Sequence, residues 1–112
     1  MVELHVERDE QDGWLILRFA GTVDASTLIL FEQALAQVGE ENPPRLILDF
    51  EHLTHINSRG LGLMLATIRH LRHHGGQVKT VNINEHLQAI MDLLGLSRLL
   101  QDEDQENGET DS

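Results

Sequence analysis

The chain begins with alternating apolar and polar residues. The segment VELHVE, residues 2–7, has the two-residue period of a half-buried strand. The pair Asp12-Gly13 is a turn signal, and the apolar segment 14–20 that follows predicts a second strand. We expect these two strands to form an antiparallel hairpin.

Helical spacing follows in the segment LILFEQALAQV, residues 28–38. Its apolar residues recur every three or four positions, at Leu28, Phe31, Leu35 and Val38. Either Asp24 or Ser26 can cap this helix at its start. Pro43 and Pro44 cannot continue a helix, so the helix must end before them.

Two more strands and a second helix are predicted in the centre of the chain. RLILDF, residues 45–50, is a short apolar run between helix breakers, typical of a strand that is covered on both faces. Residues 58–74 predict a helix that ends at Gly75 and Gly76. QVKTVNI, residues 77–83, predicts the next strand.

The segment NEHLQAIMDLLGL, residues 84–96, predicts a third helix with Asn84 as its cap and Gly95 at its end. Its buried stripe is expected at Leu87, Ile90, Met91 and Leu94. Residues 97–100, SRLL, are a candidate for a short last strand. Strand–helix–strand units require parallel neighbours joined by right-handed crossovers. The order of elements therefore predicts an α/β protein with a small mixed sheet, an N-terminal antiparallel hairpin, parallel βαβ units and helices packed on the sheet.

The second predicted helix has two different faces at 100° per residue. The core face is expected at Leu61, Met64, Leu65, Ile68 and Leu71. The opposite face holds Arg59, Gly62, Leu63, Ala66, His70 and His73. A helix face that meets only water usually carries long charged residues. Gly62, Leu63 and Ala66 are instead small or apolar, which suits the close approach of a partner protein, although small exposed residues can also be tolerated without a purpose.

Ser58 is expected at the mouth of this helix, as its cap or first residue. The first turn of a helix has unpaired N–H groups and a partial positive charge, which favour an anion. A phosphate on Ser58 would add about −1.5 to −2 charge there. Gly60 is expected to keep the approach free of a side chain, and Arg59 lies close enough in sequence to pair with a phosphate. An ordinary Asn-Ser helix cap is the alternative.

The formal charge of −11 disfavours nucleic acid as a partner, because binding to phosphates requires Lys and Arg. Six of the acidic residues lie in the segment 101–112, which contains no base, so residues 1–100 carry −5. We expect residues 1–100 to form one domain and residues 101–112 to be an acidic, disordered tail. The tail is either a solubilising end or a docking segment.

The 112 residues include no cysteine, so neither a disulfide framework nor a thiolate metal site is possible. The N-terminus has no signal-peptide core, and no stretch reaches the ~20 apolar residues of a membrane span. We therefore expect a cytoplasmic protein without membrane insertion.

Other chemistry has little support in the sequence. His70, His73 and His74 have a spacing that could hold a metal, but no carboxylate completes the set, and such residues are ordinary at a helix C-terminus. Ser58 has no evident base or oxyanion arrangement, which argues against a hydrolase. Asp24 and Asp49 are expected at a turn and a strand end, where they would cap backbone donors and shape the surface near Ser58. We expect no enzyme activity, no cofactor and no metal.

Three segments resemble the STAS domain family, and within it the free-standing bacterial anti-sigma factor antagonists. LILDFEHLTHINSRGLGLML is similar to the family's apolar strand, spacer and phosphoacceptor serine before a Gly-Leu pair. GTVDAST resembles the turn before the family's first helix, and GGQVKTVNINEHLQAIMDLLGL resembles its last strand and helix. The likeness runs from about Trp14 to Leu100.

This resemblance implies a partner switch controlled by Ser58. In such proteins a serine kinase of the GHKL type, which is itself the anti-sigma factor, phosphorylates the serine, and a PP2C-type phosphatase removes the phosphate. The unmodified form binds the anti-sigma factor and frees a sigma factor. The expected partner-binding residues are Asp24, Asn57, Ser58, Arg59, Gly62, Leu63 and Ala66.

The sequence departs from the family pattern on both sides of Ser58. Asn57 stands where the family usually has Asp, and Arg59 stands where a small residue is common. These differences leave the acceptor in place but leave the identity of the kinase open. An alternative interpretation is a STAS adaptor subunit of a larger assembly, such as a lipid-transport complex or a stress-sensing particle, with no sigma factor.

Overall fold

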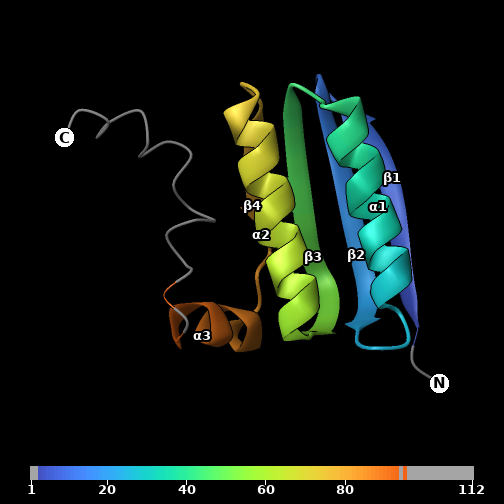
Figure 1. Ribbon diagram of the computed structural model, residues 1–112, viewed down its shortest axis with the longest axis vertical. Coiled ribbons are helices and arrows are strands. Elements are labelled where there is room, and N and C mark those ends of the chain that lie inside the picture. The colour runs from blue at the N-terminus through green and yellow to red at the C-terminus, as the bar shows by residue number, and fades with distance from the viewer. Residues whose placement is uncertain (1–2, 94, 96–112) are drawn as a thin grey trace.

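The structure is a computed structural model that describes residues 3–93 and 95. Its elements in chain order are β1 (Leu4–Gln11), β2 (Trp14–Val23), α1 (Leu28–Glu41), β3 (Arg45–Ile56), α2 (Ser58–His73), β4 (Gln77–Val81) and α3 (Glu85–Leu93) (Figure 1). The predicted order of strands and helices is confirmed. The predictions for Leu94, for a strand at 97–100 and for the tail at 101–112 lie outside the described residues.

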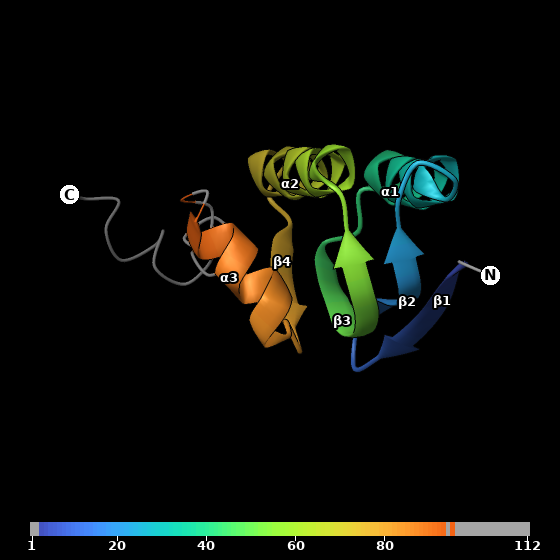
Figure 2. The same cartoon turned by 90° about the horizontal axis from the view of Figure 1, so that it is seen from below.

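The four strands form one sheet in the order β1-β2-β3-β4. β1 pairs antiparallel with β2, whereas β2–β3 and β3–β4 pair in parallel. Helices α1 and α2 lie side by side on one face of the sheet (Figure 2), and α3 lies at the end of the molecule where α2 begins (Figure 1). We call the face without α1 and α2 the outer face. The predicted mixed sheet with an N-terminal hairpin is confirmed.

The hairpin turn follows from two residues that adopt positive φ. Asp12 has φ 53° and Gly13 has φ 85°, the combination that a tight two-residue turn between twisted strands requires. Both strands extend further than the apolar pattern predicted, because β1 reaches Gln11 and β2 reaches Val23. The backbone of Glu3 packs closely on Gly21, since a Cβ on residue 21 would lie 2.0 Å from the Glu3 carbonyl oxygen.

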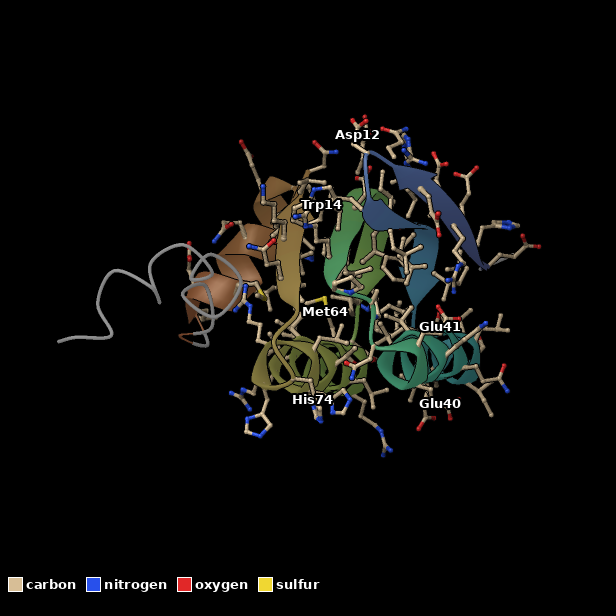
Figure 3. All side chains as sticks on the ribbon, turned by 90° about the horizontal axis from the view of Figure 1, so that it is seen from above. Asp12, Trp14, Glu40, Glu41, Met64 and His74 are labelled. Carbon is tan, nitrogen blue, oxygen red and sulfur yellow. The ribbon has the colours of Figure 1, made fainter. Side chains whose placement is uncertain are left out.

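The core lies between the sheet and the helices. The Phe19 ring stands edge-on to Phe31 of α1 with centroids 5.2 Å apart, and it stacks on Phe50 of β3 at 5.6 Å. Met64 of α2 is fully buried between its helix and the sheet (Figure 3). The core face predicted for α2 is confirmed, because Leu61, Met64, Leu65, Ile68 and Leu71 are all buried.

Strand β3 is twice as long as its apolar run suggested. It runs for 12 residues to Ile56, and its pairing with β2 shifts register twice on the way. Asp49 is therefore in the middle of a strand, and the expectation that it lies at a strand end near Ser58 is wrong. Seven residues of strand, roughly 23 Å, separate it from Ile56, after which Asn57 and Ser58 follow. On the outer face its carboxylate accepts from Asn82 Nδ2 at 2.9 Å and lies 3.6 Å from Arg18 Nε.

Helix ends follow the predicted breakers, with one exception. Asn42 ends α1 with φ 53°, directly before the two prolines, and Gly75 follows α2 with φ 89°. The exception is the start of α1, where Thr27 is the N-cap residue without a side-chain cap bond. Asp24 instead organises the turn before the helix, so neither Asp24 nor Ser26 is the cap.

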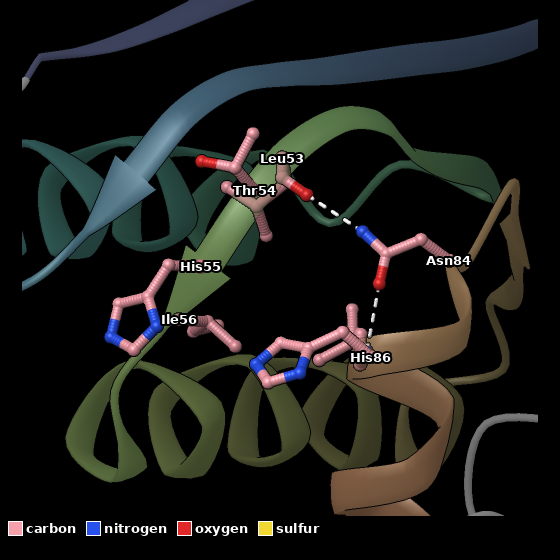
Figure 4. A pocket seen from close by; sticks show the side chains of 7 residues that line it. Leu53, Thr54, His55, Ile56, Asn84 and His86 are labelled. Carbon is pink, nitrogen blue, oxygen red and sulfur yellow. Dashed lines mark hydrogen bonds between the residues drawn. The ribbon is translucent and has the colours of Figure 1, made fainter.

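Asn84 fixes α3 against the end of β3, as Figure 4 shows. Its Oδ1 accepts from the Leu87 N–H at 2.8 Å, which is the predicted cap, and its Nδ2 donates to the Leu53 carbonyl at 2.9 Å. This bridge closes a shallow hollow that also includes His55 and His86 and has no space for a water molecule. Leu87 and Met91 are buried as predicted, and Ile90 packs on the core in part.

Gly60 has a different role from the one expected. It is buried, and a Cβ on it would lie 2.6 Å from Val23 Cγ1 and 3.1 Å from Ile56 Cγ1. The missing side chain therefore lets α2 pack onto the strand ends and does not open the approach to Ser58. Gly62, one residue beyond Leu61, faces open space, since a Cβ added to it would meet no atom within 4 Å.

The two glycines provide a matched pair of substitutions. Gly60→Ala should lower the free energy of unfolding by about 1–3 kcal/mol, because the added methyl overpacks the contact between α2 and β2. Gly62→Ala should raise it by about 0.5–1 kcal/mol, because alanine has the better helix propensity and meets no neighbour. Urea unfolding of both variants measures the difference, and equal effects would contradict this packing.

Candidate functional site

The parallel pairing of β2 and β3 brings two loops to the same edge of the sheet. Val23 lies opposite Ile56, and the Asn57 N–H donates to the Val23 carbonyl at 2.9 Å. Asp24 directly follows one strand and Ser58 begins the helix that follows the other. Both α1 and α2 start at this end of the molecule (Figure 1). The sequence-predicted residues Asp24, Asn57 and Ser58 are therefore brought together.

Asn57, and not Ser58, is the N-cap of α2. The Asn57 backbone is extended, with φ −83° and ψ 173°, and its Oδ1 accepts from the Gly60 N–H at 2.8 Å. An amide at this position performs the capping that an aspartate would perform, because both side chains present an oxygen to the first turn. Ser58 is left as the first helical residue.

The Ser58 hydroxyl is available for chemistry. Ser58 is exposed, and its hydroxyl has no hydrogen-bond partner among the described residues. The first turn of α2 contains no acidic residue, whereas its last turn contains His70, Arg72 and His73. The helix therefore leaves its partial positive end uncompensated beside Ser58. An anion attached to this hydroxyl would be electrostatically favoured.

Arg59 supplies a full positive charge in the same helical turn as Ser58. It follows Ser58 in the first turn of α2, its side chain is exposed, and it forms no ion pair with any residue in the ranges 3–93 and 95. A guanidinium in this state keeps all its donors available for an anion, and guanidinium–phosphate pairs are among the stronger hydrogen-bonded contacts in proteins. Arg59 is therefore positioned to contact either a phosphate or a partner's carboxylate.

Asp24 organises the loop that faces this helix start. Its Oδ1 accepts from the Ser26 hydroxyl at 2.7 Å and from the Ser26 N–H at 2.9 Å. The Thr27 hydroxyl also stabilises this turn, because it donates a hydrogen bond to the Thr22 carbonyl oxygen at 2.7 Å. The pKa of Asp24 is lowered, chiefly by the Ser26 hydroxyl and also by the backbone N–H groups of Ser26 and Thr27. Asp24 thus holds a fixed negative charge at the same edge as Ser58.

A shallow groove runs between α1 and α2. It has a volume of about 270 Å³ and is lined by Glu32, Leu35, Ala36, Gly39, Leu63, Ala66, Thr67 and His70. Gly62 and Ala66 are exposed, and Leu63 is half-buried with its other side on the core. We call Gly62, Leu63, Ala66, Ala36 and Gly39 the helix patch. Apart from Leu63 its residues are glycine or alanine, so a partner can approach the backbone of both helices.

The α1 side of this patch was not predicted from the sequence. Ala36 and Gly39 are three residues apart on the flank of the buried stripe that contains Leu35. That spacing places them on one face, but only the packing of α1 beside α2 shows that this face borders Leu63. The contact between α1 and α2 belongs to the tertiary structure, and the apolar pattern of each helix alone does not predict it.

The histidines at the end of α2 behave as helix-end residues. The His74 ring nitrogen Nδ1 lies 2.8 Å from the His70 carbonyl, and their rings are 4.4 Å apart. Within the described residues, no three His, Asp or Glu side chains come together as a metal site would require. Every helix in residues 3–93 and 95 is too short or too polar to cross a bilayer.

Comparison with known proteins identifies the family of this sequence. Residues 5–107 match the STAS domain. The chain belongs to the STAS domain family. The anti-sigma-B factor antagonist of Staphylococcus aureus strain NCTC 8325 / PS 47 is 20% identical over 99 residues, which are 88% of this chain and 92% of that protein.

Solved STAS structures share the fold. A crystal structure of an anti-sigma factor antagonist from Mycobacterium paratuberculosis superposes with a TM-score of 0.76 at 25% identity, over 86% of this chain and 81% of that one. The Bacillus cell fate determinant SpoIIAA in its phosphorylated form superposes with a TM-score of 0.66 at 18% identity, over 85% and 87%. The fold predicted from the resemblance is confirmed.

The Asn57 cap gives a direct test of the site's architecture. Asn57→Ala should lower the free energy of unfolding by about 1 kcal/mol, because the Gly60 N–H loses its acceptor. Asn57→Asp should retain the cap, since its carboxylate accepts the same bond. Denaturant unfolding of the two variants measures this, and equal losses would show that the amide does not cap α2.

The lowered pKa of Asp24 predicts a pH dependence. A carboxylate with a lowered pKa stabilises the fold above its unfolded value of 3.8, and this stabilisation is lost as the pH falls through the lower folded value. The wild-type protein should therefore exceed Asp24→Asn in stability at neutral pH. The difference should shrink below about pH 4. Urea unfolding over a pH series measures it, and a difference that widens in acid would contradict the assignment.

Proposed function

We propose that this STAS protein is an anti-sigma factor antagonist whose binding to its anti-sigma factor is controlled by reversible phosphorylation of Ser58. The observation that carries the proposal is the exposed, unpartnered Ser58 hydroxyl at the start of α2, at the rim of the helix patch. The names of the staphylococcal and mycobacterial relatives support the general function. The phosphorylated state of SpoIIAA supports a modification in this fold.

The unmodified protein binds through the helix patch and the loops beside it. Gly62, Leu63 and Ala66 offer an apolar contact surface along α2, and Arg59 and Asp24 present one charge of each sign at the same end of the molecule. A partner that covers this surface removes the Ser58 hydroxyl from water without having to desolvate a charge on the Ser58 side chain. Asn57 takes part indirectly, because its cap fixes the direction of α2.

Phosphorylation of the Ser58 hydroxyl changes the free energy of binding to the partner. A phosphate adds about −1.5 to −2 charge, and burying it under a partner costs desolvation energy and repels nearby carboxylates. The helix start and Arg59 would hold the phosphate in the free protein, which further favours the dissociated state. A loss of ~3 kcal/mol would weaken binding by about two orders of magnitude.

The proposed partners are an anti-sigma factor that is also a serine kinase of the GHKL type and a PP2C-type phosphatase. The kinase must reach the Ser58 hydroxyl, which is exposed. Its recognition surface must accommodate Arg59, so we expect an acidic residue of the kinase opposite this guanidinium. The protein itself acts by binding and has no catalytic residue in this proposal.

Charge substitution at Ser58 tests the switch. Ser58→Ala should bind the anti-sigma factor as tightly as the wild type, because the alanine is small and uncharged. Ser58→Asp should weaken binding at least tenfold, since it carries one negative charge where a phosphate carries about two. Isothermal calorimetry with the purified kinase encoded nearest to this protein measures both affinities.

A matched control separates the switch from a general effect of charge. Gln33→Asp makes the same change of charge on an exposed part of α1 and should leave the affinity unchanged. Equal binding by Ser58→Asp and Ser58→Ala would rule out the switch. Co-purification of a transporter ATPase without any kinase from native cells would instead favour the adaptor function.

A further inference from the structure

The outer face of the sheet divides into two electrostatically different halves. One half surrounds Arg18, which lies 3.3 Å from Asp9, 3.6 Å from Asp49 and 4.0 Å from Glu7. The pKa of Asp9 is lowered, first by the Glu10 backbone N–H and then by Arg18. Arg18 is therefore already paired with carboxylates and is not available to a further anion.

The other half contains two cations on one aromatic ring. Lys79 Nζ lies 4.9 Å from the centroid of the Trp14 indole, and the Arg45 guanidinium carbon lies 5.9 Å from it. Trp14 belongs to β2, Arg45 to β3 and Lys79 to β4, so three neighbouring strands contribute to this cluster. Figure 3 shows Trp14 on the side of the sheet that is away from the helices. We call Trp14, Arg45 and Lys79 the outer-face patch.

No described carboxylate pairs with either cation of the outer-face patch. A groove at its edge is lined by Glu10 and Glu41 together with Arg45. Glu41 is already bound to Arg8 by two side-chain hydrogen bonds. Arg45 and Lys79 thus concentrate positive charge on a chain whose formal charge is −11.

Apolar surface continues beside the two cations. Ile16 lies opposite Ile47 in the register of β2 and β3, and Ile47 lies opposite Lys79 in that of β3 and β4. Ile47 is half-buried, and the Trp14 ring is partly exposed. A ligand of this surface should therefore carry negative charge and accept contact with an indole face.

The C-terminal segment of the same chain has the complementary chemistry. Its acidic residues are Asp102, Glu103, Asp104, Glu106, Glu109 and Asp111, and it has no base. The 19 residues after Leu93 can span roughly 60 Å when extended, more than the 47 Å length of the described molecule. They follow α3, and β4, the strand that carries Lys79, comes directly before α3 in the chain.

We propose that residues 101–112 bind the outer-face patch of the same molecule. Their carboxylates pair with Arg45 and Lys79, and the bound segment covers the face of Trp14. Exposed ion pairs are individually weak, but tethering supplies an effective concentration on the order of millimolar. At this effective concentration the tethered segment occupies a weak binding site on its own molecule. This contact is distinct from the Ser58 switch, because the outer face lies across the sheet from α2.

Trp14 is the only tryptophan in the chain, so its fluorescence reports directly on this contact. The experiment compares the full-length protein with a variant in which the six acidic residues of 101–112 are changed to Asn and Gln. Acrylamide quenching of Trp14 should be stronger in the neutralised variant at 10 mM salt. The two proteins should converge at 1 M NaCl, because the Debye length falls from about 30 Å to about 3 Å.

A double-mutant cycle locates the contact. The difference between native and neutralised tails should disappear in the Arg45→Gln, Lys79→Gln background. It should persist in the Arg69→Gln background, where an exposed arginine of α2 is removed instead. Each comparison is made within one background, so direct effects of the substitutions on the indole cancel.

Three results would overturn the proposal. One is equal quenching of the native and neutralised tails at low salt. Another is a difference that survives the loss of Arg45 and Lys79, which would place the tail elsewhere. The third is a protection of Trp14 that increases with protein concentration, which would show that the segment binds a second copy of the chain.

Discussion

The last hydrogen bond between β2 and β3 joins the Asn57 N–H to the Val23 carbonyl at 2.9 Å, and the position of the site depends on it. It holds the loop of Asp24 and the start of α2 at one edge of the sheet. Gly60 makes this geometry possible, since any Cβ would collide with Val23. The Asn57 cap then leaves Ser58 as an exposed first residue with an unused hydroxyl. Backbone pairing, close packing and capping therefore combine to present one nucleophilic oxygen.

The two faces of the sheet have separate roles in the two proposals. The helix-covered face creates the core and the helix patch, where apolar contact and a single modifiable oxygen suit a reversible protein–protein interaction. The outer face carries the Arg18 network and the outer-face patch, whose charges are local and sensitive to salt. In the proposed switch, a phosphate on Ser58 would act on the first surface only, because the sheet separates it from Trp14, Arg45 and Lys79.

Most of the fold was predictable because the signals were local. The Asp12-Gly13 turn, the prolines after α1, the Asn84 cap and the apolar faces of the helices depend on neighbouring residues, and each was confirmed. The full length of β3 was not, because most residues after Phe50 are polar and are held in the strand by pairing with β2. Asp49 and Gly60 were misjudged for the same reason, since their neighbours come from other elements. Ser58, Asn57 and Arg59 were placed correctly at the helix start, whereas Ala36 and Gly39 depend on the contact of α1 with α2.

The proposed switch requires the Ser58 hydroxyl to be the regulated atom of this protein. Mass spectrometry of the protein purified from its native cells, grown with and without stress, examines that atom itself. We expect one phosphate, localised to Ser58 and not to Ser26 at the neighbouring loop, with an occupancy that changes between the two conditions. A phosphate localised to another residue, or an unmodified Ser58 under every condition, would contradict the proposed switch.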